Sequence, residues 1–296
     1  MKKNILVISY SQTGQLTAIV ESFLSGFSNK IHIDYIKLDE IYNYKFPWSM
    51  QSFFGVFPDS VLKKTESHFM LDYDEKYDKK YDLVILGYQP WFLSPSIPIS
   101  TFLQSDFAKK ILPGKAVITI IGCRNMWTQA QETVKGLIKD VNAHWVGNIT
   151  LYDKAYNFVS LFTILRWMLR GQKGNSGVNK KDIEQNKIYG KYVNDVIIKN
   201  EPIAQQALVN LGAVKIIPHL ALMEKRAFII FLKFAQLIDK EKKPLKKKFK
   251  IKLFQLYLII AILIFSPISM AISLLIRMLH PKKYKEIINY YAGLDH

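Results

Sequence analysis

The chain opens with the segment Ile5-Leu6-Val7-Ile8-Ser9-Tyr10-Ser11-Gln12-Thr13-Gly14-Gln15-Leu16-Thr17. Its first four residues are apolar and mostly β-branched, which predicts a strand buried on both faces. Hydroxyl-bearing residues then surround Gly14, and a helix-like apolar pattern follows at residues 18–24. This order of strand, glycine-containing loop and helix start places backbone N–H groups where the helix dipole favours negative charge. The loop is therefore expected to bind a phosphate group.

The glycine content of this loop narrows the kind of phosphate ligand. It has a single glycine, whereas a dinucleotide-binding loop has several, and it lacks the Gly-Lys-Ser/Thr ending of a nucleoside-triphosphate loop. A terminal phosphate is therefore expected rather than a pyrophosphate. The alternative is an ordinary strand-to-helix turn built from small residues.

Four further runs read as strands. Alternating residues at 31–36 predict an edge strand, and the apolar runs at 82–87, 116–121 and 145–151 predict buried parallel strands. With helical patterns between them, these runs predict a doubly wound α/β fold with a five-stranded parallel sheet. Ligands of such sheets lie beyond the carboxyl ends of the strands, so the loops after residues 87 and 121 should border the same crevice as Gly14.

An aromatic-rich segment at residues 41–75 interrupts the usual α/β spacing. It is expected to be an insertion, either a lid over an apolar ligand or a satellite core. His68 lies within it without Cys, Asp or His at a metal-binding spacing, so no metal site is predicted. The aromatic residues of the insertion are Tyr42, Tyr44, Phe46, Trp48, Phe53, Phe54, Phe57 and Phe69.

Ser11-Gln12-Thr13-Gly14 followed by Thr17 resembles the FMN-phosphate loop of flavodoxin-like proteins, with one additional residue before the last threonine. The resemblance covers about residues 3–200 and implies a flavodoxin-like fold with FMN as cofactor. In that family the loop after the third strand flanks the isoalloxazine ring, and the loop after the fourth contacts its pyrimidine edge. The cofactor-binding residues implied here are Ser9, Ser11, Gln12, Thr13, Gly14, Gln15, Leu16, Pro90, Trp91, Phe92, Leu93, Gly122, Cys123, Arg124, Asn125 and Trp127.

Several of these residues have a structural alternative. Trp91 and Phe92 are expected to stack on the flat ring, or else to pack loosely in the core. Arg124 would stabilise a reduced, anionic flavin, or else cap a helix or pair with a carboxylate. Cys123 is expected to be chemically inert. No catalytic base stands out, although His144, Tyr88 and Tyr152 lie near the ends of expected strands.

Charge and cysteine content limit the class of protein. One cysteine excludes a disulfide framework and fits a reducing compartment, and no cleavable signal peptide is expected. The formal net charge is +17, of which residues 201–296 contribute +10 from 16 Lys+Arg and 6 Asp+Glu. Flavodoxin electron carriers are acidic, so this basic chain differs from a soluble shuttle and is expected to meet an anionic surface.

Residues 201–296 are expected to form a basic helical extension to a sheet domain of residues 1–200. Eight lysines lie within residues 240–252, and residues 253–276 carry no charge, with Pro267 among them. Basic residues flank both sides of this apolar segment of 253–279, which favours two short helices hinged at Pro267 or an in-plane anchor, on the cytoplasmic face of an inner membrane. A single span or a buried pair of helices is the alternative. The lysines would attract anionic lipid, and residues 157–170 also fit an interfacial helix. No nucleic-acid motif is present.

An FMN site joined to a membrane-associated tail predicts a redox enzyme that acts on a lipid-like molecule. The pattern of residues 10–16, the basic apolar extension and the chain length resemble bacterial dialkylresorcinol condensing enzymes, which work beside a ketosynthase. The resemblance implies FMN-dependent aromatisation of a 2,5-dialkylcyclohexane-1,3-dione to a dialkylresorcinol. The alternatives are a membrane-associated NAD(P)H:quinone reductase and a tethered flavodoxin-like electron carrier.

Overall fold

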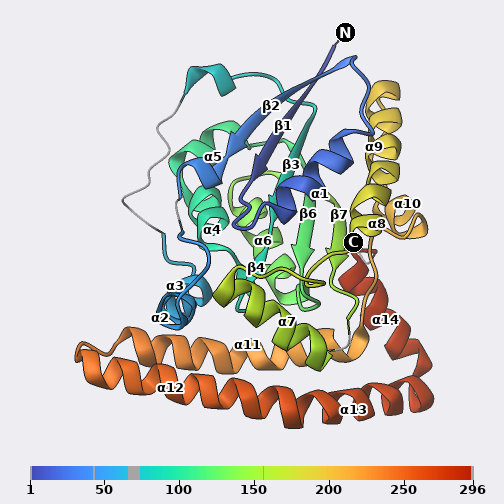
Figure 1. Cartoon of the computed structure of the whole chain (residues 1–296). Coiled ribbons are helices and arrows are strands. Elements are labelled where there is room, and N and C mark those ends of the chain that lie inside the picture. Colours follow the sequence, from blue (N-terminus) through green and yellow to red (C-terminus); the bar gives the residue numbers. More distant parts are fainter. Residues whose placement is uncertain (1, 43, 66–73, 156, 295–296) are drawn as a thin grey trace.

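Five parallel strands form the central sheet of the computed structural model, which describes residues 2–42, 44–65, 74–155 and 157–294 (Figure 1). Their order is β2-β1-β3-β6-β7, with every neighbouring pair parallel. This is the flavodoxin-like order, in which the direction of winding reverses between β1 and β3. The expected fold class is confirmed. The strands are β1 (Lys3–Ser9), β2 (Ile31–Lys37), β3 (Leu83–Tyr88), β6 (Ala116–Cys123) and β7 (His144–Tyr152).

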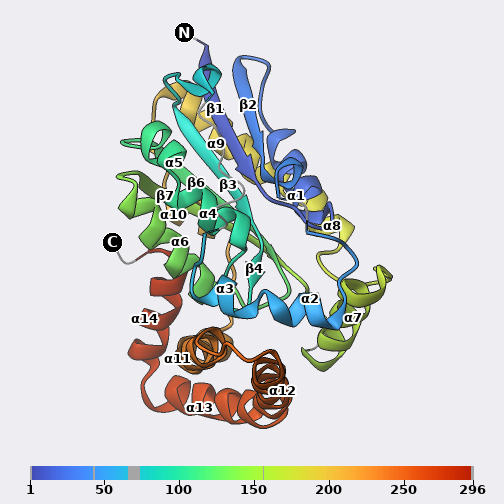
Figure 2. The ribbon, with the colours of Figure 1, turned by 90° about the vertical axis from the view of Figure 1, so that its left-hand side faces the viewer.

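Helices cover both faces of the sheet, because alternate strand residues point to opposite sides. Ile5 and Val7 face one helical layer, whereas Leu6 and Ile8 face the other. The first layer contains α1 (Gln15–Leu24), α8 (Lys180–Gln185) and α9 (Lys187–Lys199), and the second contains α4 (Ile97–Gln104), α5 (Asp106–Ile111) and α6 (Thr128–Asp140) (Figure 2).

Asn186 separates α8 from α9. The side-chain amide of Asn186 donates a 2.7 Å hydrogen bond to the carbonyl of Ile19 in α1. Nearby, a Cβ at Gly190 would lie 1.8 Å from the carbonyl oxygen of Phe23. Close approach of α9 to α1 therefore requires glycine at this position.

The insertion folds into two short helices, α2 (Met50–Gly55) and α3 (Phe57–Val61). The Ser49 hydroxyl accepts a 3.0 Å hydrogen bond from the Ser52 amide, which caps the start of α2. Residues 66–73, including His68 and Phe69, lie outside the described part of the chain.

The first helix after residue 200 packs against the sheet, and the next three helices do not. The division expected at residue 200 falls ahead of α10 (Gln205–Asn210), which packs on β7. There the Gln205 side chain accepts a 2.8 Å hydrogen bond from the Asn148 amide. The helices α11 (Pro218–Asp239), α12 (Pro244–Ile260), α13 (Ser266–Leu279) and α14 (Pro281–Ala292) follow. We call α11, α12 and α13 the platform, because they lie together beneath the carboxyl edge of the sheet (Figures 1 and 2).

The hinge expected at Pro267 is not present. The helix α12, a π-helical turn at Ala261–Phe265 and α13 form one uninterrupted helix of 36 residues. Proline falls in the first turn of α13, where the π turn ahead of it has already shifted the hydrogen-bond ladder, so the missing N–H causes no break. By length and apolar composition this helix could cross a membrane. Only 6% of its most apolar 18-residue stretch is buried, so the helix is not part of the buried helix pair given above as an alternative.

Candidate functional site

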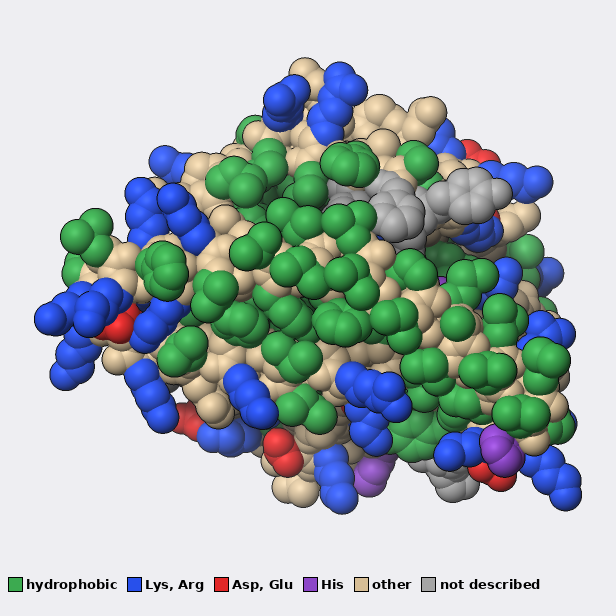
Figure 3. Space-filling model, turned by 90° about the horizontal axis from the view of Figure 1, so that it is seen from below, with side chains coloured by type: hydrophobic (Ala, Val, Ile, Leu, Met, Phe, Trp, Pro, Cys, Tyr) green, Lys and Arg blue, Asp and Glu red, His purple; other side chains and the backbone are tan. Residues whose placement is uncertain are grey.

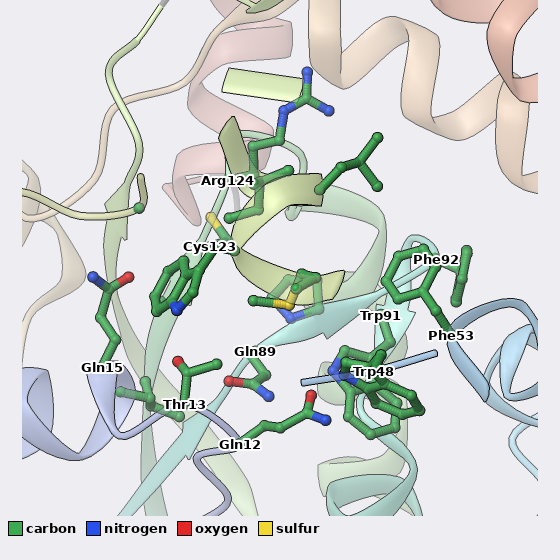
Figure 4. Close-up of a pocket in the computed structure, with 18 of the residues that line it drawn as sticks. Gln12, Thr13, Gln15, Trp48, Phe53, Gln89, Trp91, Phe92, Cys123 and Arg124 are labelled. Atoms are coloured by element: carbon green, nitrogen blue, oxygen red, sulfur yellow. The ribbon is translucent and has the colours of Figure 1, made fainter. Parts of the chain in front are cut away.

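A cavity of about 210 Å³ opens at the carboxyl edge of the sheet (Figure 4). The loops after β1, β3 and β6 form its floor, which is the position where doubly wound sheets bind ligands. Its other walls come from α2 and from α7 (Asn157–Arg170), the helix expected at residues 157–170. The lining residues are Gln12, Thr13, Gln15, Leu16, Trp48, Phe53, Val56, Gln89, Pro90, Trp91, Phe92, Gly122, Cys123, Arg124, Ile164, Leu165, Trp167, Met168 and Gly177.

One end of the cavity is polar and fits a phosphate-bearing group. Gly14 has a φ of 75°, and a Cβ placed there would meet nothing within 4 Å, so the space beside the start of α1 is open. The Ser11 hydroxyl accepts a 3.2 Å hydrogen bond from the Thr17 amide, whereas the earlier N–H groups of a helix have no carbonyl ahead of them to bond. The Nε2 atom of Gln12 is buried without a hydrogen-bond partner among the described residues. These groups can donate to an anion.

The side chain of Gln15 fixes one wall of the cavity. Its side chain accepts from the Val178 amide and donates to the Val178 carbonyl, both at 3.1 Å. The neighbouring Gly177 has a φ of 80°, and a Cβ there would lie 2.6 Å from Gln15 Oε1 and 2.8 Å from the Trp167 ring. The segment after α7 is therefore fixed against the start of α1.

The other end of the cavity is aromatic. The Trp91 ring packs edge-on against Tyr10, Tyr44 and Trp48, with centroid distances of 5.8, 5.0 and 5.5 Å. In Figure 4, Trp48, Trp91, Phe53 and Phe92 lie to one side of the cavity, away from Thr13 and Gln15. The Trp48 amide donates a 2.8 Å hydrogen bond to the carbonyl of Met168, which ties the insertion to α7. These walls suit a flat apolar ligand.

A strained hairpin carries Trp91 into this end. Strands β4 (Pro90–Trp91) and β5 (Ser94–Pro95) are joined by Phe92 and Leu93 alone, with φ values of 50° and 63°. Hairpins with positive φ at both central residues usually use Asn and Gly there, because the left-handed region costs other residues roughly 1–2 kcal/mol each. The buried Ser60 hydroxyl of α3 donates to the Trp91 carbonyl at 3.0 Å.

Packing under the hairpin offsets this strain. Phe92 contacts Phe53 and Phe57 at centroid distances of 5.2 and 5.3 Å, and Phe57 stacks on Phe254 of α12 at 3.6 Å. The ring contacts of Phe92 therefore go mainly to an aromatic cluster shared with the platform. The insertion meets both expectations in part, because Trp48 and Phe53 line the cavity while Phe54 and Phe57 form a satellite core.

The loop after β6 brings one cation to the cavity. Arg124 is half-buried, and burial lowers the pKa of its guanidinium, while the negative charge of Asp153 acts in the opposite direction. Asp153 is buried and its two oxygens accept from the amides of Ala155 and Gly177 at 2.9 and 3.3 Å. Burial raises the pKa of the Cys123 thiol well above its usual value, so this residue stays protonated at neutral pH.

Glu224 of α11 connects the platform to this loop. Its two carboxylate oxygens accept from the amides of Trp127 and Gln129 at 3.1 and 2.9 Å, which caps α6. The side chain is fully enclosed, and burial raises the pKa of its carboxyl group to about 8, although the hydrogen bonds from the capped helix lower it in part. A residue remote in sequence thus fixes the end of the cavity loop.

The structure brings together most of the expected site. Ser9, Ser11, Gly14, Leu93, Asn125 and Trp127 do not line the cavity, and all except Gly14 are buried. The expected residues that do line it are Gln12, Thr13, Gln15, Leu16, Pro90, Trp91, Phe92, Gly122, Cys123 and Arg124. Sequence reasoning missed Val56, Gln89, Gly177 and the four residues from α7, and it named Trp48 and Phe53 only as members of the insertion.

None of the three candidate bases fits the cavity. Tyr88 is fully buried and donates a 2.7 Å hydrogen bond to Gln131, and burial raises its pKa further. His144 begins β7 and therefore lies at the opposite edge of the sheet. Tyr152 ends β7 and is half-buried without lining the cavity. Among the described residues that line it, none is a carboxylate or an imidazole.

Comparison with known proteins gives only distant likeness. No protein-family model matches the chain, and no curated protein matches it. Among solved structures, a flavodoxin from the domain Archaea is 12% identical, covering 66% of this chain and 99% of its own, with a TM-score of 0.39. An NAD(P)H:quinone oxidoreductase from Methanothermobacter marburgensis is 9% identical, covering 67% and 98%, with a TM-score of 0.39. A flavoprotein in complex with FMN from Lactobacillus acidophilus is 17% identical, covering 50% and 93%, with a TM-score of 0.38.

The sequence identities and TM-scores are too low to indicate an activity. The fold is therefore assigned from the topology of this chain alone. The order and direction of its strands define it, together with a cavity at the point where the winding reverses. By its own topology, the chain has a flavodoxin-like α/β fold to which a long apolar helix is attached.

Proposed function

We propose that this protein is a flavin-dependent oxidoreductase that binds FMN in the cavity at the carboxyl edge of its sheet. The main support for this proposal is that the two ends of one cavity differ in chemistry, one polar and the other aromatic. The unpaired Nε2 of Gln12 and the open space at Gly14, next to the cavity, suit a terminal phosphate, and the tryptophan-lined end suits a flat ring. Bound FMN would supply a two-electron acceptor or donor.

We further propose that the substrate is an apolar cyclic ketone, with a 2,5-dialkylcyclohexane-1,3-dione as the specific candidate. Aromatisation to the dialkylresorcinol removes one hydride, for which bound FMN would supply the acceptor, and one proton. The lining residues include neither a carboxylate nor an imidazole, so the proton would leave to water. The carbonyl groups of such a dione acidify the adjacent carbon, so no strong base is needed. Arg124 would favour the anionic reduced form of a flavin beside it.

A membrane-associated NAD(P)H:quinone reductase is the second candidate, because flat apolar walls hold a quinone as well as a dione. A tethered electron carrier is the third, in which no small molecule enters. The apolar side chains of α7 that line the cavity favour a small-molecule substrate over a carrier, since a carrier needs only an exposed flavin edge.

The test begins with the visible absorption spectrum of the purified protein, titrated with FMN. Bound FMN should shift and sharpen the flavin bands, and failure to bind would contradict the proposal. Anaerobic mixing of the FMN-bound protein with each reductant then separates the candidates. Bleaching by the dione, with resorcinol as product, supports the aromatase. Bleaching by NADPH alone supports the reductase, and bleaching only by a redox protein supports the carrier.

A further inference from the structure

We propose that the platform lies flat on an anionic lipid leaflet, with the outer face of the α12–α13 helix in the plane of the membrane. The first observation is an uninterrupted apolar stripe on that face. Leu253, Leu256, Ile260, Ile264, Ile268, Leu275 and Met278 are exposed at steps of three, four or seven residues, which places them on one side of a helix, and the exposed Leu263 and Leu274 lie beside them. Figure 3 shows hydrophobic side chains gathered across this face.

A patch of this extent is rarely left in water. The stripe runs from residue 253 to residue 278, which corresponds to roughly 37 Å of helix at ~1.5 Å per residue. Contiguous apolar surfaces of such size on a soluble protein mark sites of association. The occupant should therefore be large, flat and apolar.

Positive charge at both ends of the stripe identifies the occupant. Lys246, Lys247 and Lys248 are exposed ahead of it, Arg277 is exposed at its far end, and Lys282 and Lys283 are exposed beyond it. Figure 3 shows Lys and Arg side chains around the edge of the hydrophobic face, with few acidic ones. Anionic headgroups above a hydrocarbon layer complement an apolar surface with a basic rim, and each lysine near the membrane strengthens binding about fivefold.

Contacts on the opposite side of the helix favour an in-plane position over a span. Near its start, Lys250 pairs with Glu241 at 2.8 Å and donates to the Leu237 carbonyl at 3.0 Å. Near its end, the Ser269 hydroxyl donates to the His219 carbonyl at 2.6 Å. The helix is therefore held along nearly the whole length of α11, which carries the exposed cations Lys225, Arg226 and Lys233. A span would have to leave α11 or take those charges into hydrocarbon.

Sedimentation with lipid vesicles tests the surface. The full-length protein should bind vesicles of phosphatidylcholine with phosphatidylglycerol, and bind phosphatidylcholine alone much more weakly. A variant with Leu256→Asn, Leu263→Asn and Leu274→Asn should lose binding at least tenfold, while Ile188→Asn with Leu211→Asn on the sheet domain should not. All five side chains are about half exposed, so folding should be unaffected. Equal binding by the two variants would overturn the proposal.

The charge rim has its own test. Changing Lys246, Lys247 and Lys248 to glutamine should weaken binding to the anionic vesicles by about a hundredfold, at about fivefold per lysine. Changing the exposed Lys30, Lys139 and Lys199 of the sheet domain to glutamine is the matched control. The parent protein could instead fail to bind vesicles and form a dimer in solution that the asparagine variant dissociates. That result would show that the stripe binds a second copy of the chain and would contradict our proposal.

The in-plane position is tested by labelling. Lys246→Cys and Lys283→Cys, made singly, should both react with a membrane-impermeant maleimide when the protein is bound to the outside of vesicles. Protection of either cysteine until the vesicles are lysed would indicate a span. The parent protein, with Cys123 alone, gives the background. Binding should be the same with and without FMN, so failure of the flavin proposal would leave this one standing.

Discussion

Gly14 lies outside the lining of the cavity but belongs to the loop that we propose binds the phosphate. Its φ of 75° favours glycine, and asparagine is the side chain that tolerates this region best. Gly14→Asn should therefore fold normally but fill the open space with its side chain, lowering FMN affinity at least tenfold. Gly14→Ala adds strain of roughly 1–2 kcal/mol as well. The measurement is an FMN titration paired with thermal unfolding.

The matched control for Gly14 is Gly136→Ala. Gly136 lies on the exposed side of α6, where an added Cβ also meets nothing within 4 Å, but its φ is not in the left-handed region. This change should leave FMN affinity unchanged and slightly stabilise the helix. Unaltered FMN affinity in Gly14→Asn would show that the loop does not hold the phosphate.

Glu224 should make the stability of the protein depend on pH. Burial raises the pKa of its carboxyl group to about 8, well above the usual value, so the folded state holds this proton more tightly than the unfolded state. The free energy of unfolding should therefore be highest below the unfolded pKa and fall as pH rises toward 8, by up to about 1.4 kcal/mol per pH unit. Urea unfolding at several pH values measures the slope.

The control for this pH dependence is Glu224→Gln, which cannot ionise and should flatten the slope, at the expense of one oxygen acceptor for the capped helix. Glu286→Gln, at an exposed position of α14, should leave the slope as it is in the parent protein. If the slope persisted in Glu224→Gln, another group would be responsible.

At the scale of elements, the aromatic cluster between the insertion and the platform is the main connection. Phe254 is fully buried and stacks on Phe57, whereas Phe249, on the same helix, is 67% exposed. Phe254→Ala should lower the free energy of unfolding by about 3–5 kcal/mol, and Phe249→Ala by less than about 0.5 kcal/mol. Chemical denaturation followed by circular dichroism measures both. Equal effects would mean that the platform is not packed against the insertion.

The strands and the first loop could be read from sequence because their signals are local. An apolar run such as residues 83–86 is buried on both faces, and a lone glycine between a strand and a helix takes the left-handed conformation at the start of α1. The partners of α7 could not be read in this way. Its apolar residues recur all around the helix, so the pattern alone does not say that Trp167 and Met168 turn toward the cavity.

Two other features depend on contacts between distant segments. Glu224 follows the buried residues Leu220 and Ala221 at helical spacing. This spacing indicates that the acidic residue lies on the buried face of α11. Its hydrogen-bond donors, however, lie almost a hundred residues earlier. The absence of a hinge at Pro267 depends on the π turn ahead of it and on α11 beside it, and neither follows from the proline itself.

At the scale of the whole molecule, both apolar and charged groups should contribute to lipid binding. Raising the salt concentration to about 1 M shortens the Debye length to ~3 Å and screens the lysines, but it leaves the apolar stripe unaffected. High salt should therefore weaken vesicle binding without abolishing it, as followed by sedimentation. Complete release by salt would mean that the stripe does not enter the lipid.

The cap that Glu224 places on α6 has a consequence for how the protein unfolds. Because the carboxylate comes from α11 and the capped amides from the sheet domain, the two parts are expected to open together as one cooperative unit. A shortened chain ending near residue 217 would leave α6 uncapped and the rings of Phe57 and Phe92 in water. What looks in the sequence like a detachable tail is therefore part of the same cooperative unit as the sheet, and the flavodoxin-like half should aggregate when produced alone.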